Sequence, residues 1–275
     1  MKKYLITDCH RMGDDNMLYI DSHVHIGDAT LVEKYVTTSE YRNRIRLYAA
    51  LDSECVATQE EYLEGCNKYF GIPIVLKEID VHSANEYLEE FVGNHEACIP
   101  VFLVGDDVQM YSRNDAWILK EHFLHHKADK WRERKSSYAY LNERGGYLLI
   151  HSSDSVRIDY VSMLREYYPN MKIIIAHMGR NVYEDTIFSE SVIDAFADDE
   201  NVFFDISTIK NPQILLYACQ MIGVERILFG SDFPYEYKKD WKREEIFATL
   251  EQTGLCKEDM TKILYSNALR IIENK

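Results

Sequence analysis

The stretch GYLLIHSSDSVRIDYVSMLREYYPNMKIIIAH, residues 146–177, decides the fold because the same pattern occurs in it twice, an apolar run that ends at a histidine. The apolar run Gly146-Tyr-Leu-Leu-Ile150 stops at His151, a stretch of helical period covers about 155–168, and a second apolar run stops at His177. Short apolar runs rich in Ile and Leu are typical of parallel strands buried on both faces, with helices outside. The stretch therefore predicts a strand–helix–strand unit with a histidine at the end of each strand.

The same pattern along the rest of the chain predicts eight strands, most of them separated by stretches of helical period. They cover residues 19–24, 72–79, 99–104, 116–120, 147–150, 172–176, 201–205 and 226–230. The third gap, 106–115, has room only for a short helix or an irregular loop. This alternation predicts an α/β fold, a (β/α)8 TIM barrel, which is typically ~250 residues long. We therefore expect residues 1–275 to form a single domain.

Helix boundary signals support this alternation. Thr58 and Glu61 have the spacing of a capping box. Asn211 is placed to cap a helix that Pro212 begins and Gly223 ends. We expect helices to begin and end at these residues, outside the predicted strands.

Metal-binding residue types recur where the predicted strands stop. His23 and His25 lie in Tyr19-Ile-Asp-Ser-His-Val-His-Ile-Gly27, His151 and His177 end the runs quoted above, and Asp232 follows Arg226-Ile-Leu-Phe-Gly-Ser231. Each residue alone is more often a satisfied polar group or a cap than a ligand. A parallel barrel, however, collects catalytic groups at the C-terminal ends of its strands. Imidazoles with one carboxylate suit zinc or another first-row divalent ion, with a position left for water.

Composition and charge narrow the classes of partner. The net charge of -15 and pI near 5.1 disfavour nucleic acid and anionic membrane surfaces, which demand basic patches. The six cysteines are scattered without a Cys-x-x-Cys pair, as in a reduced cytosolic protein, and no segment approaches the length of a membrane span. We expect a cytoplasmic protein that acts on a small molecule, and the sequence leaves open whether it forms a homo-oligomer.

Six ordered motifs carry a family resemblance. They are Asp21-Ser-His-Val-His-Ile-Gly27, Leu149-Ile-His-Ser-Ser153, Ile175-Ala-His-Met-Gly179, Phe203-Phe-Asp-Ile-Ser207, Ile227-Leu-Phe-Gly-Ser-Asp-Phe-Pro234 and Asn267-Ala-Leu-Arg270. As a set they resemble the amidohydrolase superfamily, and within it the amidohydrolase-related subgroup of metal-dependent hydrolases and aminocarboxymuconate semialdehyde decarboxylase relatives. The resemblance covers residues 19–272, with 28–58 as its main gap.

The resemblance implies roles for individual residues. His23, His25, His151 and Asp232 match the family's metal ligands, and Asp232 is also placed to take up and return a proton. His177 matches a residue that activates water beside one metal in mononuclear relatives and is a ligand in binuclear ones. Binuclear members also bridge their metals through a residue usually on strand four, where this chain has Lys120 and Glu121. The resemblance favours one ion and leaves two open.

The expected function is that of a metal-dependent hydrolase, in which a divalent metal lowers the pKa of its water to ~7 for attack on a small carboxylate-bearing ester, lactone or amide. The alternative on the same metal is a decarboxylase or hydratase, because the subgroup contains lyases. A third class, a metal-free binding protein on a decayed barrel, is disfavoured because all five site residues are retained. A phosphoesterase or deoxyribonuclease barrel is disfavoured by the net acidity and the segment around Asp232.

Candidate substrate contacts are expected at the mouth of the barrel. Lys120 and His122 end the fourth predicted strand, while Arg180 and Tyr235 follow the His177 and Asp232 motifs, where structural salt bridges are the alternative role. His125 and His126 share helical spacing with His122, and a solvated helix start explains them more simply than a second metal site. The extended connection 28–57 is expected to cover the pocket.

Overall fold

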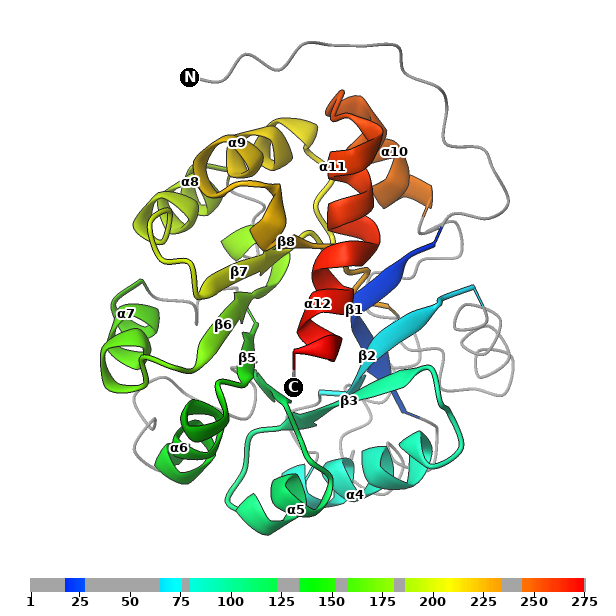
Figure 1. Ribbon diagram of the computed structural model, residues 1–275, viewed down its shortest axis with the longest axis vertical. Coiled ribbons are helices and arrows are strands. Elements are labelled where there is room, and N and C mark those ends of the chain that lie inside the picture. The colour runs from blue at the N-terminus through cyan, green and yellow to red at the C-terminus, as the bar shows by residue number, and fades with distance from the viewer. Residues whose placement is uncertain are drawn as a thin grey trace, which may run out of the picture.

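The chain forms a ring of parallel strands surrounded by helices (Figure 1). The computed structural model describes residues 18–27, 65–75, 80–122, 134–151, 158–180, 186–233 and 244–274. Its single sheet has eight strands whose order in space is their order in the sequence, all of them parallel. They are β1 (Ile20–Ile26), β2 (Lys68–Pro73), β3 (Cys98–Leu103), β4 (Ile118–Glu121), β5 (Tyr147–Ile150), β6 (Lys172–Ile175), β7 (Val202–Asp205) and β8 (Ile227–Leu228).

The segment after β8 closes the ring against β1. Val24 and Phe233 form a parallel bridge, and the Asp232 backbone N–H donates to the His23 carbonyl oxygen at 2.8 Å. Because the backbone groups of the first and last strands satisfy each other, the sheet is a (β/α)8 barrel, as the sequence predicts.

Most helices follow the strands and cover the outside of the ring, whereas the last one, α12 (Asn267–Glu273), lies over its middle (Figure 1). The others are α4 (Val81–Val92), α5 (Val108–Arg113), α6 (Lys135–Arg144), α7 (Ile158–Tyr167), α8 (Thr186–Ala195), α9 (Pro212–Ile222), α10 (Glu244–Gln252) and α11 (Lys257–Thr261), with short turns η2 (Ala176–Gly179), η3 (Val224–Arg226) and η4 (Lys262–Ser266). The boundaries of α9 confirm the prediction, because the Asn211 side chain accepts from the Gln213 N–H and Pro212 is the first helical residue.

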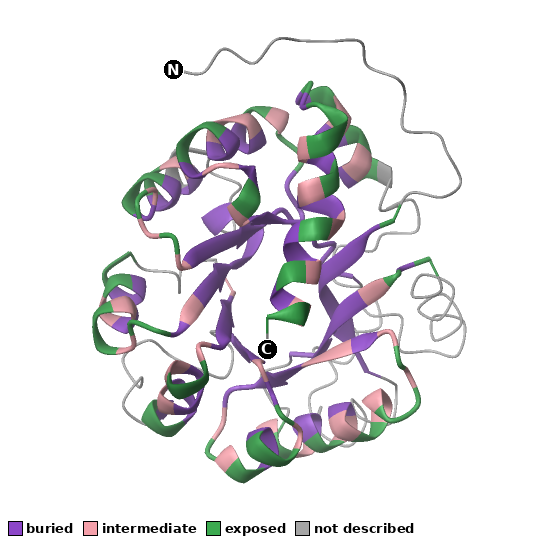
Figure 2. Cartoon of the chain, viewed as in Figure 1, coloured by how far each residue is buried: buried purple, intermediate pink, exposed green. Residues whose placement is uncertain are grey.

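Two apolar clusters divide the core between the inside and the outside of the barrel. One joins alternate strand residues to the helices, and the other contains the opposite strand faces, including Ile118, Leu149 and Ile174, with Ala268 and Ile271 from α12. The strands are buried along almost their whole length (Figure 2), as expected of a parallel sheet covered on both faces. Alternation therefore assigns each strand side chain to the interior or to the helix layer.

A register shift in β1 determines which face its histidines occupy. Ile20 belongs to the interior cluster, whereas Val24 and Ile26 belong to the cluster under the helices, although strict alternation would place all three together. The pairing of β1 with β2 is irregular between Asp21 and Val24. This shift reverses the alternation, as a bulge does.

The second predicted strand is wrong in position: the sequence predicts 72–79, and the structure has Lys68–Pro73. Gly71 and Pro73, residue types that usually interrupt strands, lie within it. A Cβ on Gly71 would meet Cys98 Sγ at 2.4 Å, so glycine is what allows β3 to approach this closely. The third gap contains the short helix α5, one of the two expected outcomes.

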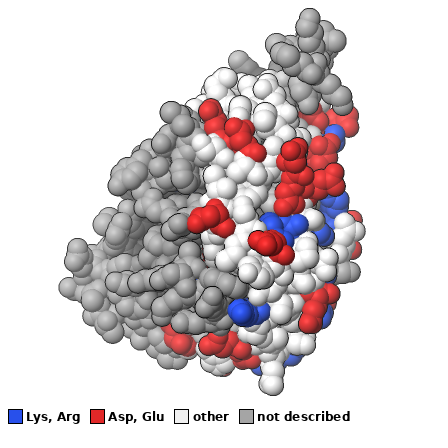
Figure 3. Space-filling view, turned by 90° about the vertical axis from the view of Figure 1, so that its left-hand side faces the viewer, with Lys and Arg blue, Asp and Glu red and all other residues white. Residues whose placement is uncertain are grey.

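Some expectations fall on residues outside the described ranges: the capping box at Thr58 and the connection 28–57. The single domain over 1–275 stays a prediction. The four cysteines within the described ranges, Cys66, Cys98, Cys219 and Cys256, are free thiols. Acidic side chains are spread over the described part of the face in Figure 3, consistent with the net charge of -15. Within the described residues, helices long and apolar enough to cross a membrane are absent.

Candidate metal centre

His23, His25 and Asp232 meet at the C-terminal end of the barrel. The carboxylate oxygen Oδ1 of Asp232 lies 3.3 Å from His23 Nε2 and 3.2 Å from His25 Nε2. All three residues are buried. The side chains that the sequence places at the ends of the first and last strands are thus in direct contact.

Each of these two imidazoles lies between two acceptors. His25 Nδ1 is 3.3 Å from the Pro73 carbonyl oxygen, and His23 Nδ1 is 2.8 Å from Asp205 Oδ2. Burial lowers the pKa of His25 to about 4, so at neutral pH this ring has one N–H for its two acceptors. A cation beside Asp232 Oδ1 would balance the lone pairs of this oxygen and of the imidazole nitrogens, which otherwise face one another. The donor set itself therefore suits a divalent metal.

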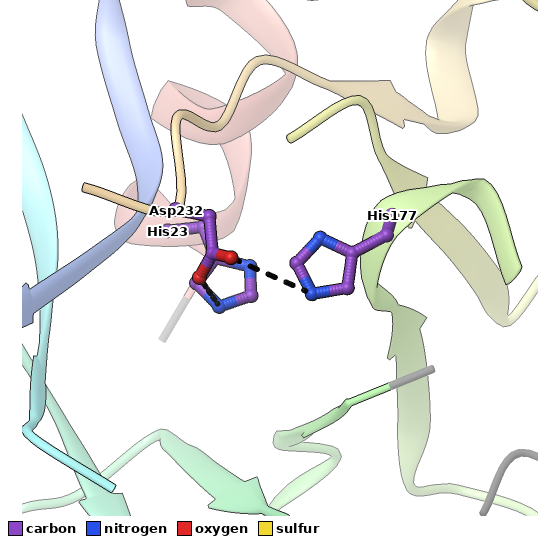
Figure 4. A group of neighbouring side chains, drawn as sticks. All are labelled: His23, His177 and Asp232. Atoms are coloured by element: carbon purple, nitrogen blue, oxygen red, sulfur yellow. Dashed lines mark ion pairs between the residues drawn. The ribbon is translucent and has the colours of Figure 1, made fainter. Parts of the chain in front are cut away.

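His177 approaches the same carboxylate from the other side (Figure 4). Its Nε2 lies 4.0 Å from Asp232 Oδ2, and its ring stacks on His23 at 5.0 Å between centroids. The candidate ligand atoms of His23, His177 and Asp232 all lie within 4.8 Å of one another. Burial lowers the pKa of His177 to about 3. The geometry allows His177 either to bind an ion or to stand beside one.

His151 joins this group through His177. Its Nδ1 lies 3.2 Å from His177 Nε2, and its ring lies 4.1 Å from the His122 ring. Burial, followed by the neighbouring His177, lowers the pKa of His151 well below its usual value. The candidate ligands and the two strand-end histidines of β4 and β5 thus form one continuous polar cluster.

Asp205 and Ser207 belong to the site, although the sequence analysis assigned them no role. Burial alone would raise the pKa of Asp205, but His23, His177 and the Ser207 hydroxyl outweigh it and hold the pKa below its usual range. Ser207 Oγ lies 2.7 Å from His177 Nδ1. The signal was present in the sequence, because Asp205 ends β7 as His151 follows β5.

Asp232 carries the strongest charge in the cluster. Burial would raise its pKa, but the neighbouring His177, His23 and His25 outweigh burial and hold the pKa well below its usual range. The side chain is therefore an ionised carboxylate at neutral pH. An ionised oxygen beside two imidazole nitrogens is what a divalent cation requires.

Lys120 and Glu121 occupy opposite faces of β4. Lys120 Nζ lies 3.2 Å from His23 Nε2, inside the barrel, and burial lowers its pKa to about 8. Glu121 points into the helix layer, where it accepts from the hydroxyls of Tyr138 on α6, at 2.8 Å, and Tyr160 on α7, at 2.7 Å, and lies 3.4 Å from Arg134. We call Glu121, Arg134, Tyr138 and Tyr160 the strand-4 clasp. The clasp faces away from the metal centre.

Arg180, a predicted substrate contact, lies beside the centre. Its Nε donates to Thr208 Oγ1 at 2.8 Å, and that hydroxyl lies 3.5 Å from His177 Nδ1. His122 is buried at the end of β4. Tyr235, His125 and His126 lie outside the described residues.

The backbone at these strand ends is strained. Among the described residues, His177, Met178, Thr208 and Asp232 are four of five non-glycine residues with positive φ, between 51° and 63°. Non-glycine residues adopt this conformation rarely, at a cost of ~1–3 kcal/mol each, and such residues cluster at functional sites. The strain marks the ends of β6, β7 and β8, three of the strands that supply the polar cluster.

Comparisons with known proteins agree with this geometry. A family model described as amidohydrolase matches residues 20–273. A curated gamma-resorcylate decarboxylase from Polaromonas sp. (strain JS666 / ATCC BAA-500) is 30% identical over 131 residues, which are 41% of this chain and 37% of that enzyme. The match thus covers little more than a third of the relative's length.

Solved structures share the fold over almost the whole chain. A 2,6-dihydroxybenzoate decarboxylase from Rhizobium matches with a TM-score of 0.68 and 16% identity, over 94% of this chain and 99% of that one. A putative 2-pyrone-4,6-dicarboxylic acid hydrolase from Pseudomonas putida matches with 0.68 and 15%, over 94% and 99%. A dihydroxybenzoic acid decarboxylase from Polaromonas sp. JS666, with bound manganese and an inhibitor, matches with 0.59 and 18%, over 93% and 97%. At these identities the likeness establishes the fold.

Proposed function

Since the chain belongs to the amidohydrolase family, we propose that it is a metal-dependent decarboxylase of a small aromatic carboxylic acid. This reverses the order of the two activities expected from the sequence, where hydrolysis came first. The decarboxylase is supported by the gamma-resorcylate decarboxylase, which shares 30% identity over 41% of the chain. The observation within the structure that carries the proposal is the meeting of imidazole and carboxylate acceptors beside two cationic side chains, Lys120 and Arg180.

The proposed metal ligands are His23, His25, His151 and Asp232. Their nitrogen and oxygen donors fit zinc or manganese equally well in kind. Of the two candidate bridging residues on β4, Glu121 faces away from the centre and Lys120 faces it, so we propose one ion and keep a second ion, bridged through Lys120, as the alternative. A divalent ion held there supplies a Lewis acid for an oxygen of the substrate. Every other part of the reaction is assigned to side chains of the chain itself.

Lys120 and Arg180 are the proposed binding residues for the substrate carboxylate and ring hydroxyl. Lys120 is fully buried inside the barrel, and Arg180 is fixed through its Nε by Thr208. Charged hydrogen bonds to a carboxylate are strong where water is excluded. We extend the substrate-binding role to His122, whose ring lies 4.1 Å from that of His151, and to Tyr235 as a prediction from its place after Asp232.

Asp232 and His177 are the proposed proton carriers. Decarboxylation breaks the bond between the ring carbon and the carboxylate, releases CO2, and leaves an electron pair on carbon that takes up one proton. Asp232 is ionised at rest, so this proton comes from solvent. His177, 4.0 Å from Asp232 Oδ2, passes it to Asp232, and Asp232 is the candidate that delivers it to the ring carbon. Because both residues are buried, bulk water does not compete for the carbon.

Hydrolysis of a carboxylate-bearing lactone, ester or amide is the second candidate. It is favoured by the likeness to the putative 2-pyrone-4,6-dicarboxylic acid hydrolase, at a TM-score of 0.68. The same side chains would serve it, with Asp232 taking the proton of a water molecule and passing it to the leaving group. We also propose a cytoplasmic location, which the four free cysteines of the described residues support.

Product analysis decides between the two activities. Purified protein loaded with Zn2+ or Mn2+ is incubated with 2,6-dihydroxybenzoate and, separately, with 2-pyrone-4,6-dicarboxylate, in water labelled with heavy oxygen. We expect CO2 and the decarboxylated phenol from the first compound, without label in the phenol. Ring opening of the second compound with label incorporated, and no CO2 from the first, would establish the hydrolase instead. Lys120→Met should abolish activity on the favoured substrate, whereas Lys135→Met, at the start of α6, should not.

A further inference from the structure

Asp205 anchors a branched set of hydrogen bonds under the metal centre. Its oxygen Oδ1 accepts from two backbone N–H groups, those of His177 at 2.9 Å and Ser207 at 3.0 Å. The Ser207 hydroxyl also donates to Oδ1. Since backbone N–H groups can only donate, Oδ1 is an acceptor, and the hydroxyl proton of Ser207 is directed to it.

The position of that proton fixes the tautomer of His177. With its hydrogen directed to Asp205, Ser207 Oγ can only accept from His177 Nδ1, 2.7 Å away. The carbonyl oxygen of Ser207 lies 3.3 Å from the same nitrogen, and a carbonyl can only accept. Both contacts therefore require a hydrogen on Nδ1 of His177. Its Nε2 carries the lone pair in the neutral ring.

The same reasoning extends from His177 to His151. The lone pair on His177 Nε2 lies 3.2 Å from His151 Nδ1, so in the metal-free protein this contact is a hydrogen bond when His151 carries its hydrogen on Nδ1. The second branch starts at Asp205 Oδ2, which lies 2.8 Å from His23 Nδ1 and receives its hydrogen. In both branches the hydrogen is on Nδ1, and the Nε2 atom of His23 is directed toward Asp232.

We propose that Asp205 and Ser207 are positioning residues that hold His23, His151 and His177 in one tautomer, with the hydrogen on Nδ1 and the lone pair on Nε2. One carboxylate thus prepares three rings that come from three strands, β1, β5 and the end of β6. The Nε2 atoms of His23 and His151 serve as ligand atoms through their lone pairs. The lone pair on Nε2 of His177 lets this ring accept a proton before it donates one. The inference rests on the proposed function only for these roles and not for the tautomers.

The tautomers can be observed without activity, by NMR of metal-free protein with isotope-labelled imidazole nitrogens. We expect Nδ1–H signals for all three rings, assigned by their loss in His23→Gln, His151→Gln and His177→Gln. Ser207→Ala should give a mixture of tautomers at His177 and His151. His23 should keep its tautomer, because its Nδ1 lies closer to Asp205 Oδ2, at 2.8 Å, than to Ser207 Oγ, at 3.3 Å. Ser137→Ala is the matched control, because this buried serine also donates to an oxygen, the Gly105 carbonyl at 2.6 Å, away from the centre. It should change none of the three rings.

Asp205→Asn tests the common origin of the two branches. An amide in place of the carboxylate should disturb His23 and His177 together and weaken zinc binding, measured by calorimetry, by ~10–100-fold, as loss of a partner of a metal-binding histidine does. If this variant does not fold, Ser207→Ala decides alone. A hydrogen on Nε2 of His177 in the unaltered protein, or unchanged tautomers in Ser207→Ala, overturns the proposal. Correct tautomers in a protein that releases no CO2 would instead count against the proposed function only.

Discussion

Two buried polar clusters lie on opposite sides of strand β4, and they differ in how their charges are balanced. In the strand-4 clasp, Glu121 receives two tyrosine hydroxyls and lies against the guanidinium of Arg134. In the metal centre, Asp232 Oδ1 faces two imidazole nitrogens, each in a ring whose other nitrogen also faces an acceptor. The clasp has donors for its carboxylate, whereas the centre sets several acceptors against one neighbouring cationic donor, Lys120 Nζ, at 3.2 Å from His23 Nε2.

This difference separates a cluster that holds the fold from the proposed binding site. A buried polar group with its partners in place stabilises a structure, and a cluster with more acceptors than donors indicates an unfilled requirement. Neighbouring residues, Lys120 and Glu121, fall on either side of that division because strand alternation turns them to opposite faces. Changes in the two clusters should therefore have opposite consequences for activity and stability.

The largest effect is expected from Asp232→Asn. Loss of the charge removes both a proposed ligand and a proposed proton carrier, so turnover with saturating metal should fall by ~10³-fold or more. The melting temperature of the metal-free protein should fall only slightly, because the imidazoles stabilise the ionised carboxylate but the side chain takes no part in apolar packing. Turnover and thermal unfolding measured on the same preparation check this.

The comparison would break if Asp232→Asn unfolded the metal-free barrel. Asp194→Asn is the control, since Asp194 is an exposed acceptor for the Tyr217 hydroxyl on the outer helices. It should leave both turnover and metal content unchanged.

The second largest effect is expected from Glu121→Ala, and it should appear in stability. Removing one partner from a buried ion pair destabilises a protein by ~3 kcal/mol or more, because the other polar groups stay buried. Chemical denaturation should show this loss, while the number of metal ions bound per chain stays the same. Glu89→Ala is the matched control, because Glu89 pairs with exposed Arg113 at 2.6 Å, and a surface pair contributes only ~0.2–1 kcal/mol. A loss of bound metal in Glu121→Ala would contradict the comparison, because it would show that the two clusters act as one site.

The smallest effect is expected from Tyr160→Phe. Its hydroxyl donates to Glu121 at 2.7 Å and lies 3.0 Å from the Tyr138 hydroxyl, so its removal leaves Glu121 with one tyrosine donor. The free energy of unfolding should fall by ~1 kcal/mol, the usual contribution of one hydrogen bond. Denaturant titrations of Tyr160→Phe and Glu121→Ala, run side by side, measure the two losses of unfolding free energy. Equal losses in the two variants would show that the clasp depends on this one hydroxyl.

The sequence predicted the barrel well because strand burial and helix period are local signals. The strand-end positions of His151, His177 and Asp232 follow from where apolar runs stop. Two features lay beyond such signals. The irregular pairing of β1 reverses the alternation before His23, and the position of β2 depends on the close approach of β3 to Gly71. Both are set by neighbouring strands that are distant in sequence.

Asp205 shows the corresponding limit for the site. Its place at the end of β7 is visible in the sequence, but its partners, His23 and the backbone of His177, come from two other strands. Donor and acceptor accounting needs all of these groups in space at once. Residue type and strand position could predict which residues line the centre. Only the folded chain shows how these residues orient one another.

The closure of the barrel between Val24 and Phe233 has a consequence for the life of the protein in a cell. His23 is supplied by the first strand and Asp232 by the segment after the last, so the centre cannot assemble before both have left the ribosome and paired. A metal ion at the proposed centre would therefore bind a barrel that has already closed. An ion that binds only the closed form adds about 2.7 kcal/mol when its free concentration is ~100 times the dissociation constant. Metal supply would then govern how long each molecule escapes proteolysis, as well as how fast it works.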